Sequence, residues 1–98
     1  MERAEILTIL KRHEGELRGR GVRHVALFGS MARSNETPVS DIDLLIDIDT
    51  QTPMDVFTYA GIVDYLQDLF PGPVDVANRE TLKPHIRPSV ERDAVYAF

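Results

Sequence analysis

The segment DIDLLIDID, residues 41–49, constrains the fold more than any other part of the chain. Charged and apolar side chains alternate along it, and the side chains of a β-strand point alternately to its two faces. The segment therefore predicts a strand with one face in a core and one face of carboxylates, from Asp41, Asp43, Asp47 and Asp49. Such a carboxylate face is either solvated or holds something positive, and alternation alone does not choose between the two.

The whole chain is short and acidic. Its 98 residues, 43% of them hydrophobic, suffice for a single domain, residues 1–98, with one modest core. No run approaches the roughly 20 apolar residues of a membrane span, and the charged start MERAE is unlike a secretory signal. The lack of cysteine fits a cytoplasmic protein. A net charge of −5 with scattered Lys and Arg argues against long nucleic acid as a partner.

Periodicity and turn residues divide the first half of the chain into a helix and two strands. A helix is expected from Ala4 to about Arg18, ended by Gly19 and Gly21. The run VRHVALF, residues 22–28, predicts a strand before the carboxylate strand. Between the two strands, residues 31–33 are expected to start a short helix and residues 34–40 to form a loop.

The second half predicts a long helix, a strand and a partly helical tail. Thr52 is expected to cap the helix, with Pro53 as its first residue. The expected core stripe of this helix is Val56, Ala60, Val63, Leu66 and Phe70. Residues 74–77 predict a third strand, and Pro88 is expected to kink or delay a helix beginning near Pro84. The alternation of helices and strands predicts an α/β fold with a three-stranded sheet.

Two aspartates of the carboxylate strand are suited to a metal ion. Asp41 and Asp43 are two residues apart, so their side chains share a face with Cα atoms about 6.5–7 Å apart. Like charges this close repel unless a cation binds or a proton is shared, and carboxylate oxygens suit Mg²⁺. A two-ion site generally takes a third carboxylate from a neighbouring strand, and Asp75 in the apolar run PVDVA is the candidate. The alternatives are a solvated strand face and, for Asp75, an ion pair with a basic neighbour.

The residues before this strand are suited to a phosphate. Gly29 allows a close backbone approach, and the hydroxyl of Ser30 and N–H groups at a helix start can donate to phosphate oxygens. Arg33 can neutralise the phosphate charge. The alternatives are an ordinary helix cap at Ser30 and a surface arginine at position 33.

Together these two motifs resemble a known family. The stretch ALFGSMAR followed by SDIDLLID resembles the nucleotidyltransferase signature of the DNA polymerase beta superfamily. The short length and the ending LKPHIRPSVERDAVYAF are similar to the minimal nucleotidyltransferases encoded beside HEPN-domain proteins in prokaryotic toxin–antitoxin pairs. The resemblance covers nearly the whole chain and implies a nucleotidyltransferase fold, with a mixed three-stranded sheet flanked by about four helices.

The resemblance also implies an enzymatic activity and a role for each site residue. Two Mg²⁺ ions would be held by Asp41, Asp43 and Asp75, and the nucleoside triphosphate by Gly29, Ser30 and Arg33. The reaction would move AMP from ATP to a tyrosine hydroxyl of a HEPN RNase toxin, which silences the toxin, and the two proteins would form a hetero-oligomer. Many relatives have Gly at the position of Ser34, a departure that leaves the metal ligands untouched.

Two other functions stay open on the sequence alone. The first is an antitoxin that inhibits its partner by binding, without catalysis. The second is a small-molecule, antibiotic-type nucleotidyltransferase that completes its acceptor site by dimerisation.

The remaining polar residues are expected to lie outside the catalytic site. Asp47 and Asp49 are expected to be solvated, and surface or packing roles are expected for His13, His24 and His85. A basic tail near the nucleotide or the partner is the expectation for Lys83, Arg87 and Arg92.

Overall fold

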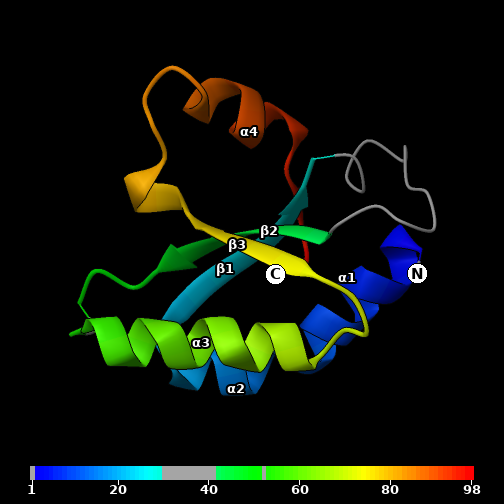
Figure 1. The fold of residues 1–98 in the computed structure, drawn as a ribbon, viewed down its shortest axis with the longest axis vertical. Helices are drawn as coiled ribbons and strands as arrows, with labels where there is room; N and C mark the ends of the chain where they lie inside the picture. The colour runs from blue at the N-terminus through cyan, green and yellow to red at the C-terminus, as the bar shows by residue number, and fades with distance from the viewer. Residues whose placement is uncertain (1, 30–41, 52) are drawn as a thin grey trace.

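Four β-strands form one mixed sheet, which is the framework of the protein (Figure 1). The computed structural model describes residues 2–29, 42–51 and 53–98. In sheet order the strands are β3 (Val74–Asn78), β2 (Ile42–Ile48), β1 (Val22–Phe28) and β4 (Val95–Tyr96). β1 is antiparallel to both β2 and β4, whereas β2 and β3 are parallel. The predicted α/β fold with a mixed sheet is confirmed, with four strands in place of three.

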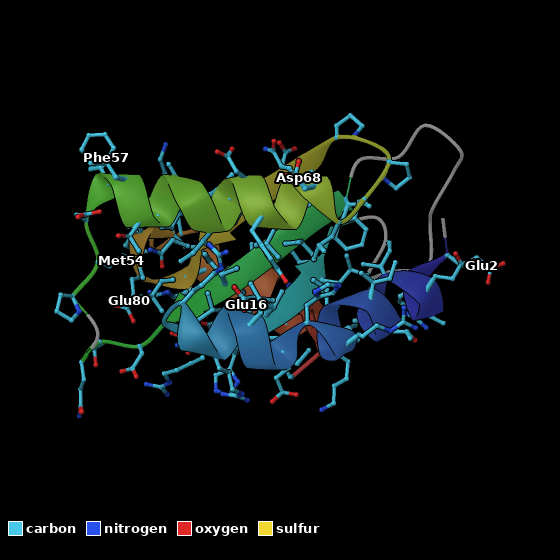
Figure 2. All side chains as sticks on the ribbon, turned by 90° about the horizontal axis from the view of Figure 1, so that it is seen from below. Glu2, Glu16, Met54, Phe57, Asp68 and Glu80 are labelled. Carbon is cyan, nitrogen blue, oxygen red and sulfur yellow. The ribbon has the colours of Figure 1, made fainter. Side chains whose placement is uncertain are left out.

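Helices cover the two faces of the sheet unequally. Figure 1 shows α1 (Arg3–Arg12), α2 (Glu14–Gly19) and α3 (Val56–Asp68) on one side and α4 (Arg87–Asp93) on the other. Figure 2 looks onto the first side, where α3 lies beside the α1–α2 pair. A short 3₁₀ helix, η1 (Arg79–Thr81), follows β3. The core fills the space between the three helices and the sheet, and its fully buried residues include Ile6, Leu10, Leu17, Val25, Leu27, Leu44, Ile46, Ile62 and Leu66.

β2 has the predicted apolar face but not the predicted solvated one. The core face is formed by Ile42, Leu44, Ile46 and Ile48. On the opposite face Leu45 is only 2% exposed and Asp47 only 9% exposed. The prediction that Asp47 is solvated is therefore wrong, because this face is itself partly covered.

Asp49 has a local structural role at the end of the same strand. It is half-buried, and its Oδ1 accepts a hydrogen bond from the backbone N–H of Gln51 at 2.9 Å. A side chain that accepts from the backbone two residues on stabilises a turn, which follows β2 here.

The N-terminal helix is split, where the sequence predicts one helix over residues 4–18. α1 ends at Arg12 and α2 begins at Glu14, so the break falls at His13. Nδ1 of His13 lies 2.7 Å from the hydroxyl oxygen of Tyr65 on α3. The two rings pack in a T-shaped, edge-to-face arrangement, with a centroid distance of 5.7 Å. His13 thus has the predicted packing role, and its contact with α3 accompanies a break that helical periodicity does not reveal. The chain turns at Gly21, whose φ is 97°.

α3 begins later than the sequence predicts. The helix starts at Val56 and its N-cap is Asp55, whose carboxylate accepts a hydrogen bond from the backbone N–H of Thr58 at 2.7 Å. Pro53 lies outside the helix, and Thr52 lies outside the described residues. Aspartate is one of the most favoured N-cap residues, because its carboxylate accepts a hydrogen bond from an otherwise unpaired N–H of the first turn.

α3 buries part of the predicted stripe: Leu66 and Phe70 are buried as expected, whereas Ala60 is exposed and Val63 half-buried. The buried positions are Ile62 and Leu66, followed by Phe70 just beyond the helix. Val56 is 80% exposed, and the neighbouring Phe57, 88% exposed, projects from the side of α3 that faces away from α1 and α2 in Figure 2. Ile62, which the predicted stripe left out, is fully buried together with Leu66, so these two residues form the buried face of the helix.

The C-terminal segment adds the strand that the sequence analysis missed. β4 is two residues long, and its Tyr96 and Val95 pair with Ala26 and Leu27 of β1. α4 begins at Arg87 with Pro88 in its first turn, as expected for a proline that delays a helix. The helix predicted at 31–33 and the loop at 34–40 lie outside the described residues.

No helix within residues 2–29, 42–51 and 53–98 combines the length and apolar character needed to cross a bilayer.

The Asp55 cap predicts a pH-dependent stability. The hydrogen bond from the Thr58 backbone N–H lowers the pKa of Asp55 below its ordinary value of 3.8. The ionised cap therefore stabilises the fold above pH 3.8, and this contribution is lost as the pH falls further, toward the lowered pKa. We expect Asp55→Ala to lower Tm at pH 7 and Asp55→Asn to lower it less, because asparagine is also a good N-cap. Thermal melts followed by circular dichroism should show the Asp55→Ala deficit shrinking below pH 3.8, and a deficit that persists unchanged there would contradict the assignment.

Candidate active site

Two aspartates lie side by side at one end of the sheet. Asp43 is the second residue of β2 and Asp75 the second residue of β3, and the two are direct partners in the parallel ladder. Neighbouring strands are about 4.8 Å apart, and paired residues of a ladder project to the same face. Their neighbours Ile42, Leu44 and Val74 point into the core, so both carboxylates project from the opposite face. Asp43 is half-buried and Asp75 is exposed.

Gly29 completes this end of the sheet from the neighbouring strand. It directly follows β1, where Phe28 pairs with Asp43, and its φ is +74°. A Cβ at position 29 would overlap Oδ2 of Asp43 and lie 3.3 Å from its Cγ. Only glycine therefore leaves room for the Asp43 carboxylate, a requirement additional to the phosphate approach predicted from the sequence.

Of the predicted site residues, the structure brings together Gly29, Asp43 and Asp75. These residues come from three neighbouring strand ends, although they are far apart in the sequence. The other three predicted residues, Ser30, Arg33 and Asp41, lie outside the described residues.

The chemistry of the carboxylate pair fits a hard divalent cation. Two carboxylates on adjacent strands repel each other, and a cation bound between them relieves the repulsion. Mg²⁺ is commonly bound by one or two carboxylates, with water and phosphate oxygens completing its shell. No group of three His, Cys, Asp or Glu residues forms a metal site among the residues that the structure describes, which do not include Asp41. Asp43 and Asp75 thus suit two of the three predicted ligand positions.

Two arginines of the C-terminal segment, Arg79 and Arg87, form hydrogen bonds between its helices. Arg87 donates from Nη2 to the backbone carbonyl of Arg79 at 2.6 Å, and Arg79 donates from Nε to Glu91 at 2.9 Å. These bonds connect η1 with α4. Lys83 and Arg92 are exposed.

The sequence analysis missed a second feature on the Asp43 face of the sheet. His24 on β1 is the direct partner of Asp47 on β2, and the two side chains line a cavity with Arg79, Tyr96 and Phe98. The low exposure of Asp47 draws attention to this cavity. The sequence does not reveal it, because the alternating pattern of β2 predicts a solvent-facing side chain at position 47.

The fold is that of a known enzyme class. The profile of the nucleotidyltransferase domain family matches residues 4–97, so the chain belongs to the nucleotidyltransferase domain family. It is accordingly a nucleotidyltransferase, a transferase of the 2.7.7 type.

Individual relatives agree with this assignment. The protein adenylyltransferase MntA of Thermococcus cleftensis is 37% identical over 93 residues, which are 94% of this chain and 92% of MntA. A solved structure provisionally described as a minimal nucleotidyltransferase superimposes with a TM-score of 0.80 at 25% identity, covering 97% of this chain and 95% of that one. A crystal structure of a toxin–antitoxin with AMP-PNP shares the fold at a TM-score of 0.69 and 16% identity, covering 90% of this chain and 72% of that one.

The packing of Gly29 against Asp43 predicts the effect of a single methyl group. In Gly29→Ala the left-handed backbone should cost about 1–2 kcal/mol, and the Asp43 carboxylate must move as well. We expect a lower Tm together with weaker Mn²⁺ binding by calorimetry, Mn²⁺ serving as a probe for Mg²⁺.

Gly15→Ala is the matched control for this substitution. Gly15 is helical and nothing lies within 4 Å of its added Cβ. Alanine should therefore stabilise the protein by about 0.5–1 kcal/mol. Equal Tm shifts and equal Mn²⁺ binding in the two variants would refute the role assigned to Gly29.

Proposed function

We propose that the protein is a Mg²⁺-dependent protein adenylyltransferase that moves AMP from ATP to a tyrosine hydroxyl of a HEPN RNase toxin and thereby neutralises it. The observation that carries the proposal is the in-register pair Asp43 and Asp75, against which Gly29 packs. The pair supplies the carboxylates that a metal-assisted phosphoryl displacement needs. A nucleotidyltransferase with this pair in place has the chemistry for the reaction.

The nature of the acceptor is supported by relatives. MntA, of which the chain covers 92%, is named a protein adenylyltransferase. The HEPN partner follows from the resemblance of the sequence to minimal nucleotidyltransferases, and the fold shared with a toxin–antitoxin is compatible with it. An RNase toxin acts on cytoplasmic RNA, so the proposal also places the protein in the cytoplasm, in a hetero-oligomer with the toxin.

The site residues divide into those that would bind Mg²⁺ and those that would hold the triphosphate. Two Mg²⁺ ions, when bound by Asp41, Asp43 and Asp75, supply positive charge to the attacking and leaving oxygens. The backbone at Gly29, the hydroxyl of Ser30 and the guanidinium of Arg33 hold the triphosphate.

The bond changes follow directly. The acceptor oxygen forms a bond to the α-phosphorus of ATP, the bond from that phosphorus to the bridging α–β oxygen breaks, and pyrophosphate leaves. Asp75 is the exposed member of the pair and receives the proton of the attacking hydroxyl.

A transfer assay tests the proposed activity. The purified protein is incubated with Mg²⁺, ATP labelled in the α-phosphate and a HEPN protein encoded by an adjacent gene. We expect the label to appear on the HEPN protein and to be lost when its acceptor tyrosine is replaced by phenylalanine. Absence of transfer from all four nucleoside triphosphates would exclude the proposed activity.

A double substitution distinguishes catalysis from inhibition by binding alone. Asp41→Asn combined with Asp43→Asn removes the charges of both predicted ligands in the Asp-Ile-Asp motif without changing side-chain size. We expect this variant to bind the partner and yet fail to relieve toxicity when both are expressed at normal levels. Full relief of toxicity by the variant would favour a non-catalytic antitoxin.

Asp75→Asn separates nucleotide binding from chemistry. The amide preserves the size of the side chain but cannot take a proton or balance the charge of the transition state. We expect transfer to slow by about 10²–10³-fold, the usual effect of losing one such group. The affinity for Mg·ATP, measured by calorimetry, should stay near that of the wild type because the other predicted ligands remain. Undiminished transfer in a folded Asp75→Asn protein would remove this residue from the site.

A further inference from the structure

Asp47 is a buried carboxylate that the proposed chemistry does not use. It lies on the same face of β2 as Asp43 and is 9% exposed. Within residues 2–29, 42–51 and 53–98, no hydrogen bond or ion pair of its side chain is found. Its oxygens are not among the fully buried side-chain atoms that lack a partner, so the carboxylate reaches the cavity that it lines and is open to a cationic ligand there.

The walls of the cavity that Asp47 faces indicate which kind of ligand it takes. Its volume is about 470 Å³, and its other walls are His24, Arg79, Tyr96 and Phe98. The rings of His24 and Tyr96 meet at right angles with centroids 5.9 Å apart, and Nδ1 of His24 lies 3.3 Å from the backbone carbonyl oxygen of Phe98.

The one cation among these wall residues is already engaged. Nε of Arg79 donates to Glu91 at 2.9 Å, and the two side chains form an ion pair between η1 and α4. The charge of Arg79 is therefore balanced by Glu91, and the charge of Asp47 is left to a ligand. Aromatic walls beside a carboxylate favour a cationic ligand, because ring faces and carboxylates both attract positive charge.

The location of the cavity relative to the carboxylate pair indicates where the cation comes from. Gly29 follows the end of β1, so the triphosphate and its leaving pyrophosphate lie, in the proposed reaction, at that end of the sheet. Attacking and leaving oxygens are roughly in line across the transferred phosphorus. The acceptor therefore approaches from the opposite direction, along the sheet, where Asp47 lies.

The strands between the two sites carry no charge on this face. The row between Asp43 and Asp47 consists of Ala26, Leu45 and Ala77, which are partners across β1, β2 and β3. Asp47 is four residues from Asp43, which is about 13 Å along a strand, or about four residues of an extended acceptor segment.

We propose that the Asp47 cavity binds a lysine or arginine side chain of the acceptor protein, within about four residues of the modified hydroxyl. This inference rests on the proposed function and makes Asp47 a determinant of acceptor specificity. His24 and Tyr96 hold the aliphatic stem of the basic side chain, and Asp47 pairs with its charged end.

Acceptor peptides test the proposal directly. Short peptides with one central tyrosine carry a single lysine at successive positions, and transfer of labelled AMP from ATP is measured for each. We expect kcat/KM at the best lysine position to exceed that of the alanine peptide by about tenfold or more, as for loss of a buried charge pair. Asp47→Asn should abolish this difference and leave the rate with the alanine peptide unchanged.

Asp68→Asn is the matched control, since it makes the same charge change on the outer side of α3, away from the sheet (Figure 2). It should preserve the lysine preference. Asp47→Asn keeps the size of the side chain, and a Tm close to that of the wild type shows that the variant is folded. A wild-type enzyme without a lysine preference, or a preference that survives Asp47→Asn, would overturn the inference.

A binding measurement keeps the test independent of catalysis. The lysine peptide is titrated into the protein without ATP, and the NMR signals of Leu45 and Tyr96 are followed. We expect shifts that saturate with the wild type and are lost with Asp47→Asn. If no peptide is labelled but the two proteins differ in binding in this way, the proposed protein acceptor is wrong and the cation site is supported. Equal binding of the peptide by the wild type and by Asp47→Asn would refute the cation site.

Discussion

The parallel pairing of β2 with β3 is the interaction on which the rest of the protein depends. It sets Asp43 beside Asp75, and it requires a connection that crosses from one end of the sheet to the other. α3 makes that crossing over the core face and buries Ile62 and Leu66 against the sheet. α3 therefore does not cover the other face of the sheet, from which Asp43 and Asp75 project.

The charges of the site are held in place by packing from behind. Asp43 and Asp75 repel each other, but each lies between core residues of its own strand, which the helices hold in register. Gly29 adds a steric constraint from the third strand, because only its missing side chain leaves space for the Asp43 carboxylate. Functional sites commonly retain such local costs, and the apolar core compensates for them elsewhere.

The sequence predicts what is periodic and misses what depends on contacts between distant elements. The bounds of β1 and the apolar face of β2 follow from local pattern, and the structure confirms both. The two-residue β4 has no period to detect, and its place beside β1 follows from pairing alone. Which positions of α3 are buried is likewise decided by packing against the sheet, which buries Ile62 and leaves Val56 exposed. Asp47 looks solvent-facing in the alternation, and only the three-dimensional fold reveals that its face is covered.

The crossover between β2 and β3 also determines when, during folding, the carboxylate pair forms. Local elements such as α1 and α3 form early and quickly, whereas a pairing between segments far apart in the chain waits for closure of the intervening loop. Asp43 and Asp75 are separated by the whole of α3, so they meet only when β3 has docked. During synthesis the ribosome releases Asp75 well after Asp43, and the carboxylate pair does not exist until then. A chain in which β3 has not docked therefore lacks the carboxylate pair, and formation of the pair marks completion of the β2–β3 crossover.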